Sequence, residues 1–337
     1  MPGREGFVLI TGGAGFIGSH LAAALGKRGV PVRILDNFST GTRENLEAVG
    51  APVDLVEGDI CDEDVCGRAV SGCDTVIHQA YPYGVATRDV DHQYVAEGAI
   101  GTFNVLRAAL RARVRKVLYA STVAVYGRQE RVPVDEEHPK NPFLPYGATK
   151  YLGELYCSTF ANVYGLDTAS CRYFNVYGPR YATYDHSALI LFMERALRGE
   201  DLLIYGDGTQ MRDYTYIDDV VTGTLLALDK PTKPGDVYNI GAGRGLTIKE
   251  LADLVVKSLG SRSKVRLAEP EEYRKTPGGL PYGITDKKDG RFLDTRKYMA
   301  DITKARRDLG YNPTTPLEEG IPRTLAWLKG KLAKGDA

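Results

Sequence analysis

The 337-residue chain lacks most of the features that mark secreted, metal-binding or membrane proteins. Its five cysteines are odd in number and include no Cys-x-x-Cys pair, so we expect reduced thiols, with neither a disulfide framework nor a zinc site. The five histidines show no metal-ligand spacing, and no metal is predicted. No apolar run approaches the roughly 18–20 residues that a membrane helix needs, and the first residues do not resemble a secretory signal. These absences predict a cytoplasmic protein.

The chain also has no formal net charge, because it contains 43 Lys and Arg residues and 43 Asp and Glu residues. A balanced chain has no broad attraction for nucleic acid or for an anionic membrane surface. We therefore expect neither as a partner. A local basic pocket for a small phosphate ligand is compatible with this balance.

The chain does contain a regular alternation of β-prone and helical segments. Such alternation predicts an α/β fold with a Rossmann-type doubly wound parallel sheet. The pattern loosens after about residue 180 into segments rich in Gly, Pro and charge, which predicts a smaller C-terminal α/β lobe. We expect the first lobe at residues 1–180, with the chain crossing back at about 215–245, and the smaller lobe mainly at 181–330. The segments that carry this prediction are strands at 7–11, 32–35, 53–57, 75–78 and 116–121, and helices at 18–28 and 94–112.

A glycine-rich loop follows the first predicted strand. Gly12, Gly15 and Gly18 form a Gly-x-x-Gly-x-x-Gly pattern that opens a helix. Glycines there permit a tight turn, close approach of a pyrophosphate to the backbone, and close packing of helix on sheet. The next strand ends at Asp36, where a carboxylate can accept hydrogen bonds from adenosine ribose hydroxyls and would repel a 2′-phosphate. The two features together predict NAD as the cofactor.

Tyr146 and Lys150 stand four residues apart after the strand that ends in Ser121-Thr122. On a helix both side chains lie on one face. A nearby cation favours the phenolate and lowers the pKa of Tyr146, which could then accept a proton from a substrate hydroxyl. The spacing alone is weak evidence in a chain with 21 tyrosines, and its position after the strand gives it weight.

The motifs in this order resemble the NAD-dependent epimerase/dehydratase family, part of the extended short-chain dehydrogenases, which includes UDP-glucose 4-epimerases. The resemblance extends to about Tyr311. It implies that Thr122 is the catalytic hydroxyl beside Tyr146 and Lys150. The segments that carry it are 11–20, 35–37, 121–127, Tyr146-x-x-x-Lys150 and 172–179. The cofactor positions that it implies are Gly12, Gly15, Phe16, Ile17, Gly18, Asp36, Asn37, Phe38, Ser39, Gly41, Asp59, Ile60, Gln79, Ala80, Tyr81, Ser121, Tyr146, Lys150 and Tyr173.

The residues after Thr122 bear on the reaction. Family dehydratases carry an Asp-Glu pair there and decarboxylases a Glu two positions on, whereas this chain has Val123 and Ala124. Neither side chain can move a proton, so epimerisation through a transient 4-keto sugar is the expected outcome.

The resemblance also implies a nucleotide-sugar site. UDP is expected, with dTDP as the alternative nucleotide, and UDP-glucose and UDP-galactose are the expected sugars. A bulky Tyr298 disfavours a 2-N-acetyl group. The substrate positions that it implies are Tyr83, Thr122, Asn175, Ala188, Leu189, Tyr205, Arg212, Arg291, Asp294 and Tyr298.

Several departures from the family pattern gather near the sugar and keep alternatives open. Tyr81-Pro82-Tyr83 is unusual, and Gly98 stands where an Asn often contacts the cofactor. A hexuronate epimerase, another NDP-sugar epimerase or a net oxidoreductase of this family therefore remain alternatives. A non-catalytic NAD-binding regulator is more remote, because Thr122, Tyr146 and Lys150 are all present. The resemblance further implies a homodimer formed through a four-helix bundle.

Overall fold

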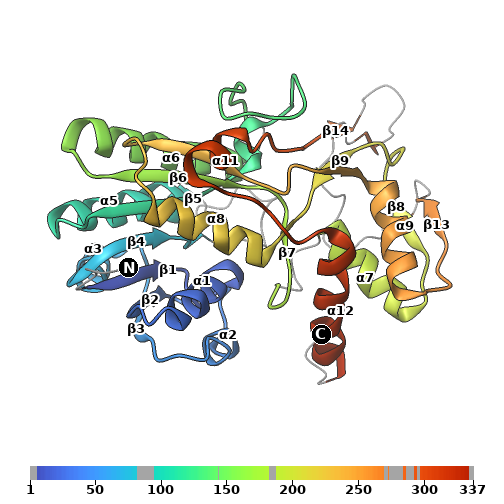
Figure 1. Ribbon diagram of the computed structural model, residues 1–337, viewed down its shortest axis with the longest axis horizontal. Helices are drawn as coiled ribbons and strands as arrows, with labels where there is room; N and C mark the ends of the chain where they lie inside the picture. The colour runs from blue at the N-terminus through green and yellow to red at the C-terminus, as the bar shows by residue number, and fades with distance from the viewer. Residues whose placement is uncertain are drawn as a thin grey trace.

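The computed structural model describes residues 6–81, 95–142, 144–181, 187–268, 272, 284–285, 292–293 and 297–333. A large lobe built on one sheet lies beside a smaller lobe that carries α7 (Ala188–Arg198), α9 (Ile248–Leu259) and β13 (Val265–Leu267) (Figure 1). Within the described residues, no helix is long and apolar enough to cross a membrane.

The large lobe is organised around a seven-stranded sheet in which every neighbouring pair is parallel. Its central strands are buried on both faces, as expected when helices cover both sides. The strand order is β11-β6-β5-β4-β1-β2-β3. The strands are β1 (Phe7–Thr11), β2 (Val32–Asp36), β3 (Asp54–Glu57), β4 (Cys73–His78), β5 (Lys116–Thr122), β6 (Thr168–Tyr173) and β11 (Asp236–Ile240).

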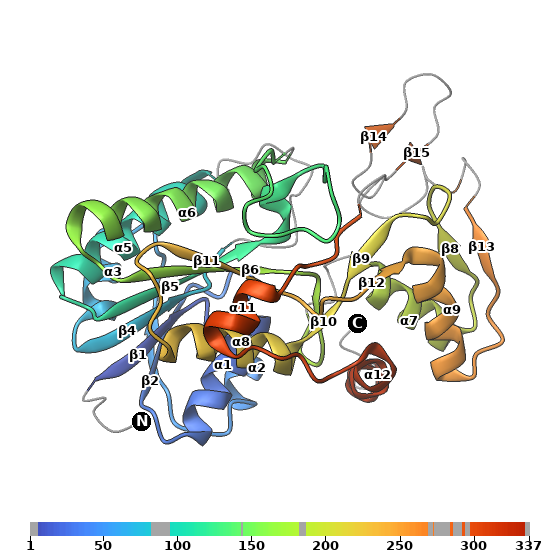
Figure 2. The same cartoon turned by 45° about the horizontal axis from the view of Figure 1, so that its top comes forward.

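Helices cover both faces of this sheet. α3 (Glu63–Val70), α5 (Thr102–Arg111) and α6 (Pro145–Tyr164) pack together on one face, with η1 (Ala96–Gly101), a π-helix, leading into α5. α1 (Phe16–Lys27), α8 (Ile217–Asp229) and α11 (Thr303–Leu309) pack on the other. Figure 2 shows the sheet between α5 and α6 above and α1 and α8 below. The short α2 (Arg43–Glu47) lies against α1.

The direction in which the chain adds strands to the sheet reverses next to β1. From β1 the chain builds outward through β2 and β3, then returns to place β4 on the opposite side of β1. The connections that leave β1 and β4 therefore diverge, which opens a crevice beyond the carboxyl ends of the strands. Thr11, Asp36, His78 and Thr122 are the last residues of their strands and meet at this edge.

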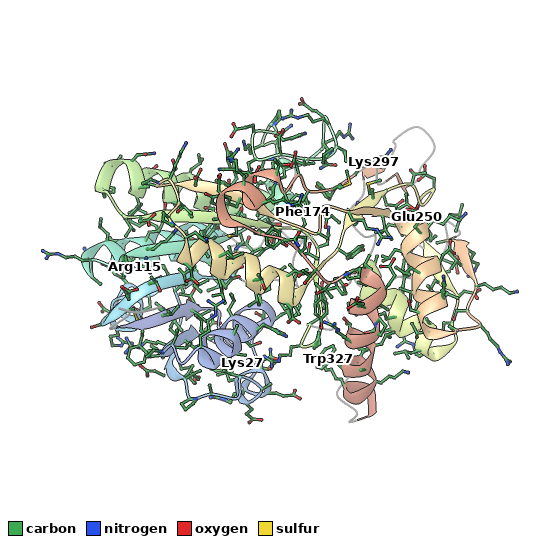
Figure 3. All side chains as sticks on the ribbon, in the orientation of Figure 1. Lys27, Arg115, Phe174, Glu250, Lys297 and Trp327 are labelled. Carbon is green, nitrogen blue, oxygen red and sulfur yellow. The ribbon has the colours of Figure 1, made fainter. Side chains whose placement is uncertain are left out.

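The smaller lobe carries short two-stranded sheets and two packed helices. α9 begins with a capping box between Thr247 and Glu250 and ends at Gly260, which has φ 58°. The chain crosses from the large lobe after β6, where Phe174 is fully buried (Figure 3). The described elements of the whole chain that have not been named above, from either lobe, are η2 (Val123–Tyr126), β7 (Val176–Tyr177), β8 (Leu202–Ile204), β9 (Met211–Asp213), β10 (Thr215–Tyr216), β12 (Gly245–Thr247), β14 (Ile284–Thr285), β15 (Phe292–Leu293) and α12 (Leu317–Ala333).

The five strands and the first helix predicted from the sequence are confirmed, with ends that differ by two residues or fewer. The helix expected over 94–112 is a π-helix followed by an α-helix, and residue 94 itself lies outside the described residues. Residues 215–240 return to the large lobe and supply β10, α8 and β11. The functional division of the chain into a cofactor domain and a substrate domain stays a proposal.

Candidate active site

The glycine-rich loop connects β1 to α1 with little space for side chains. Gly12 has φ +69°, and a Cβ there would lie 2.7 Å from the backbone nitrogen of Ala80. A Cβ on Gly18 would lie 2.2 Å from the carbonyl oxygen of Gly12. The N-cap of α1 is Gly15, which has no side chain to accept from the first N–H groups of the helix. The residues of this first turn line the same cavity as the loop, and a helix N-terminus at a cavity suits a phosphate group.

Asp36 closes β2 beside this loop. Its two carboxylate oxygens accept hydrogen bonds from the backbone N–H groups of Ala14 (2.9 Å) and Phe38 (2.8 Å). Burial raises the pKa of Asp36, and the two hydrogen bonds act in the opposite direction. The carboxylate lines the cavity and each oxygen keeps a lone pair, so it can accept from a ribose hydroxyl.

Thr122 ends β5 at the centre of the cavity. Its hydroxyl oxygen accepts a hydrogen bond from the backbone N–H of Ala124 (3.2 Å), the second residue of η2, so Thr122 caps this short helix. The hydroxyl proton can then be donated to a substrate oxygen.

Tyr146 and Lys150 lie on the first two turns of α6, which begins with Pro145 at its first helical position. The ammonium group of Lys150 donates to the carbonyl of Ala120 at 2.9 Å and is 4% exposed. Desolvation by burial lowers the pKa of Lys150 to about 7.

Tyr81 packs against both of these side chains. The Lys150 nitrogen lies 4.4 Å from the centroid of the Tyr81 ring, and the Tyr146 ring meets it edge-on at 5.2 Å. The Tyr81 hydroxyl pairs with the Thr149 hydroxyl at 2.7 Å. Gly98 makes room for this arrangement, because a Cβ there would lie 2.8 Å from Thr149 and 3.1 Å from the Tyr81 ring. The two departures noted in the sequence are therefore neighbours in space.

A buried ion pair connects α6 to the strands beneath it. Glu154, one turn after Lys150, accepts from Arg172 on β6 at 2.7 Å, and both side chains are almost fully buried. Glu154 also accepts from the hydroxyl of Ser121, and Arg172 donates to the hydroxyl of Tyr126 at 2.8 Å. This network fixes the end of β5, which carries Thr122, relative to the helix that carries Tyr146.

The other end of the cavity is formed by the smaller lobe. Asn175 donates to the carbonyl of Asp213 (3.1 Å), and Arg212 lies over the ring of Tyr298, 5.4 Å from its centroid. The Tyr298 hydroxyl donates to the carbonyl of Gly127 at 2.9 Å. This hydrogen bond to the large lobe fixes the position of the Tyr298 ring. Tyr205 also lines this end of the cavity.

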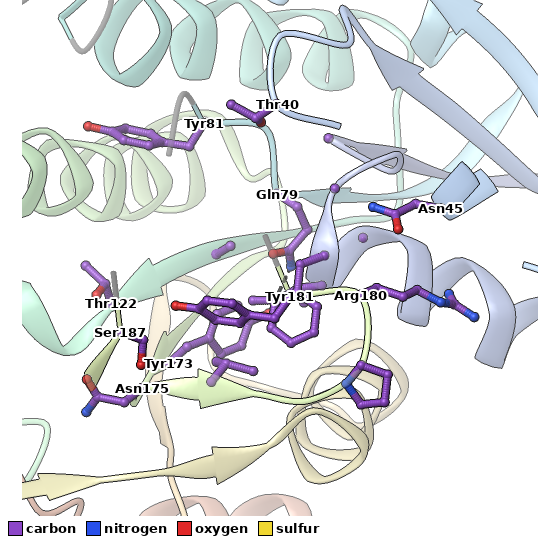
Figure 4. Close-up of a pocket in the computed structure, with 18 of the residues that line it drawn as sticks. Thr40, Asn45, Gln79, Tyr81, Thr122, Tyr173, Asn175, Arg180, Tyr181 and Ser187 are labelled. Carbon is purple, nitrogen blue, oxygen red and sulfur yellow. Dashed lines mark hydrogen bonds between the residues drawn. The ribbon is translucent and has the colours of Figure 1, made fainter. Parts of the chain in front are cut away.

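One cavity of about 1310 Å³ joins these parts (Figure 4). Four predicted positions do not line it. Asp59 accepts hydrogen bonds from the side chain of Asn37 and the backbone N–H of Cys61, and Leu189, on the buried face of α7, belongs to the hydrophobic core. Phe38 and Gly41 are the other two. Tyr83, Arg291 and Asp294 lie outside the described residues. The predicted residues that line it are Gly12, Gly15, Phe16, Ile17, Gly18, Asp36, Asn37, Ser39, Ile60, Gln79, Ala80, Tyr81, Ser121, Thr122, Tyr146, Lys150, Tyr173, Asn175, Ala188, Tyr205, Arg212 and Tyr298.

The sequence analysis missed several residues that line the cavity. Tyr181 packs edge-on against Phe16 of the glycine-rich loop, with ring centroids 5.2 Å apart. Trp327 reaches the cavity from α12, which is distant in sequence (Figure 3). Glu97 lines it from η1. Glu97 lies within the helix that the sequence predicts, but no local pattern marks it, because its place in the cavity depends on how that helix packs.

The chain is similar to known proteins over almost its whole length. The sequence pattern of the NAD-dependent epimerase/dehydratase family matches residues 8–241. A putative UDP-glucose 4-epimerase of Methanocaldococcus jannaschii is 34% identical, over 96% of this chain and 98% of its own. A UDP-N-acetyl-α-D-glucosaminuronate decarboxylase of Bacillus cytotoxicus is 35% identical, over 95% of this chain and 97% of its own.

A solved structure is equally similar. The UDP-glucose 4-epimerase of Thermotoga maritima, determined with UDP-glucose, superposes with a TM-score of 0.83 at 35% identity, over 97% of this chain and 99% of that one. The chain belongs to the NAD-dependent epimerase/dehydratase family, and its cofactor is NAD.

Proposed function

We propose that the protein epimerises a nucleotide-diphosphate sugar at C4, with UDP-glucose and UDP-galactose as substrates. The observation that carries the proposal is the placement of Thr122, Tyr146 and Lys150 around the cavity that also holds the glycine-rich loop. The family includes enzymes with other outcomes, and sequence identity does not separate them, because the epimerase and decarboxylase relatives are equally similar.

The chain supplies an acid–base pair for oxidation of the sugar. The Thr122 hydroxyl donates a hydrogen bond to the C4 oxygen of the sugar and keeps its proton, and the Tyr146 phenolate accepts the proton of the C4 hydroxyl. Lys150 favours the phenolate by its charge and offers donors for the hydroxyls of the nicotinamide ribose. NAD supplies an acceptor that takes a hydride and returns it. Tyr146 then gives its proton back to the sugar oxygen after the keto-sugar has presented its other face, so the reaction has no net redox change.

The residues beside Thr122 support epimerisation over loss of water or carbon dioxide. Val123 and Ala124 line the cavity and have no group that can carry a proton. Among the described residues that line it, the carboxyl groups come from other elements: Asp36, Glu44, Glu97 and Glu194. No acid or base of η2 therefore stands next to the catalytic hydroxyl to assist an elimination.

The residues at the end of the cavity formed by the smaller lobe favour a substrate with an unsubstituted hexose joined to a pyrophosphate. The guanidinium group of Arg212 lines the cavity and suits phosphate oxygens. The Tyr298 ring is held at both its hydroxyl and its face, so it cannot easily turn aside for a 2-N-acetyl group. UDP is the proposed nucleotide, with dTDP as the alternative.

A second candidate is a related epimerase that takes a different sugar, such as a hexuronate. The contact among Tyr81, Gly98 and Lys150 favours it, because this cluster differs from the family pattern close to the catalytic residues. A regulator without catalysis is disfavoured by the intact catalytic set.

We also propose a homodimer. Apolar side chains on η1 and α6 are exposed, with Ile100 at 55%, Leu155 at 47% and Val163 at 66%. Phe103 of α5 packs against Tyr156 of α6, so these helices form one continuous surface that could pair with a second copy as a four-helix bundle. A monomer at micromolar concentration in sedimentation would contradict this.

The test of the reaction is NMR of the purified enzyme with five substrates: UDP-glucose, UDP-galactose, UDP-glucuronate, UDP-N-acetylglucosamine and dTDP-glucose. The proposal expects interconversion of the first two without net NADH, measured by absorbance. Epimerisation of UDP-glucuronate alone would support the second candidate instead. Stoichiometric NADH would indicate a net oxidoreductase.

A further inference from the structure

A buried carboxylate joins three chain segments where the two lobes meet. Asp213, the last residue of β9, is fully buried. Its Oδ1 atom accepts a hydrogen bond from the backbone N–H of Ala242 at 2.8 Å. Its Oδ2 atom accepts from the backbone N–H groups of Gly243 at 2.9 Å and Ala300 at 3.1 Å. The carboxylate therefore connects β9 to the turn that follows β11 and to the chain around Ala300.

Asp213 does not itself line the cavity. Its neighbours in the chain, Arg212 and Tyr214, do line it, as the alternation of side chains along an extended segment predicts. Desolvation raises the pKa of Asp213 to about 6, and the hydrogen bonds from the backbone act in the opposite direction. At pH 8 the group is a carboxylate. Any influence of this charge on the reaction is exerted through the residues that it holds.

The segments that Asp213 joins carry groups at the end of the cavity formed by the smaller lobe. The backbone N–H of Tyr298 donates to the carbonyl of Met211 at 3.0 Å. The guanidinium group of Arg212, the next residue, lies over the Tyr298 ring. Ala300, which Asp213 anchors, is two residues beyond Tyr298. The carboxylate and this backbone hydrogen bond together fix Arg212 and Tyr298 against each other.

The same segment also reaches the catalytic hydroxyl. The Tyr298 hydroxyl donates to the carbonyl of Gly127, which ends η2, and η2 begins directly after Thr122. The loop that follows η2 pairs with the segment too, because the backbone N–H of Val134 donates to the carbonyl of Met299 at 2.8 Å. The segment anchored by Asp213 therefore spans from β9 to the end of η2.

We infer that Asp213 is a positioning residue for the nucleotide-sugar substrate. Its carboxylate holds Arg212 and Tyr298 in place relative to Thr122, so that a diphosphate bound by Arg212 places the sugar at the catalytic hydroxyl. The inference rests on the proposed function in one respect, which is the binding of the diphosphate by Arg212. It does not depend on which sugar is converted.

The test is a double-mutant cycle between Asp213 and Arg212, read as the affinity for UDP. Asp213→Asn keeps the shape of the side chain but has one acceptor oxygen, so its NH₂ group must face at least one of the three N–H donors. UDP is titrated by calorimetry at pH 8, well below Tm and with NAD saturating, into the wild type, both single variants and the double variant.

Asp213→Asn should weaken UDP binding by about tenfold in the wild-type background. In the Arg212→Ala background the same change should weaken it by less than about twofold, because the residue through which Asp213 acts is already gone. A general loss of stability would give the same factor in both backgrounds. The affinity of Asp213→Asn for NAD, measured separately, should stay within about twofold of the wild type, because the glycine-rich loop is untouched.

Asp219→Asn is the matched control. Asp219 is 4% exposed and accepts from the backbone N–H groups of Thr314 at 2.9 Å and Thr315 at 3.0 Å. It anchors the chain before α12 to α8, makes no contact with β9, and does not line the cavity. Its substitution should lower Tm and leave the affinity for UDP within about twofold of the wild type.

Gly241→Ala tests the same contact without removing a charge. A Cβ on Gly241 would lie 2.5 Å from the Cβ of Ala300 and 3.2 Å from the Oδ2 atom of Asp213, so it displaces Ala300 from the carboxylate. This variant should also weaken UDP binding in the wild-type background and much less in the Arg212→Ala background. It provides the test if Asp213→Asn does not fold.

Two results would overturn the inference: UDP affinity in Asp213→Asn within about twofold of the wild type, or an equal loss in both backgrounds. If Arg212→Ala weakens UDP binding and either result is found, the proposed function stands and the inference alone is wrong. If Arg212→Ala leaves UDP binding unchanged, the proposed diphosphate site is wrong and the inference fails with it.

Discussion

Replacing Tyr81 by leucine should shift the pH dependence of turnover. Lys150 is buried, and desolvation already lowers its pKa to about 7. The face of the Tyr81 ring, 4.4 Å from the ammonium nitrogen, favours the charged form of the lysine. A desolvated cation–π contact contributes about 1–2 kcal/mol. One pKa unit corresponds to about 1.4 kcal/mol, so loss of the ring should lower the pKa of Lys150 by about one unit.

The sign of the effect follows from the role of the charge. Turnover needs the cation, so it falls as pH rises through the pKa of Lys150. In Tyr81→Leu this basic limb of kcat should move down by about one pH unit. Tyr81→Phe keeps the ring and loses only the hydroxyl that pairs with Thr149, so its basic limb should stay within about 0.3 units of the wild type.

The measurement is kcat from about pH 5.5 to 9.5 for the three proteins, with NAD saturating. An unchanged basic limb in Tyr81→Leu would refute the argument that the ring stabilises the charge of Lys150. An equal shift in Tyr81→Phe would assign the effect to the hydroxyl pair instead.

Three further substitutions test the rest of the site. Tyr146→Phe should lower kcat by at least about 100-fold, with NAD affinity within about twofold of the wild type; retention of most turnover would show that Tyr146 is not the base. Asp36→Ala should weaken NAD binding by about tenfold to 100-fold in calorimetry, because a carboxylate acceptor is lost; unchanged affinity would contradict its ribose role. Glu154→Gln leaves the Arg172 charge buried with a neutral partner and should lower the free energy of unfolding in urea by about 3–5 kcal/mol. A loss below about 1 kcal/mol would show that this pair does not hold β5 and α6 together.

The large lobe could be predicted because its signals are local. Phe7 to Thr11 is a β-prone run, and the glycines that follow it satisfy a backbone constraint visible in φ +69° at Gly12. Tyr146 and Lys150 share a helix, so their spacing alone predicts a common face. The start of the helix at Pro145 and its end at Gly165 follow ordinary capping rules.

Contacts between distant segments could not be predicted in this way. Tyr81 and Gly98 each look like a departure in the sequence, and only the fold shows that the ring of one fills the space left by the other. Asp59 has the expected position after β3, yet it does not line the cavity, and its carboxylate accepts hydrogen bonds from Asn37 and from the backbone of Cys61. The exposure of Glu97 to the cavity depends on the packing of η1 against the turn after β3, where Gly101 meets Ile60, and no local pattern encodes that packing.

The most direct test of the proposed reaction follows the hydrogen at C4. UDP-glucose labelled with deuterium at C4 is converted in ordinary water, and the product is analysed by NMR and mass spectrometry. The account predicts UDP-galactose that retains the deuterium at C4, because the hydride leaves and returns within the closed site. Loss of the deuterium to solvent, or a product with unchanged C4 configuration, would contradict it.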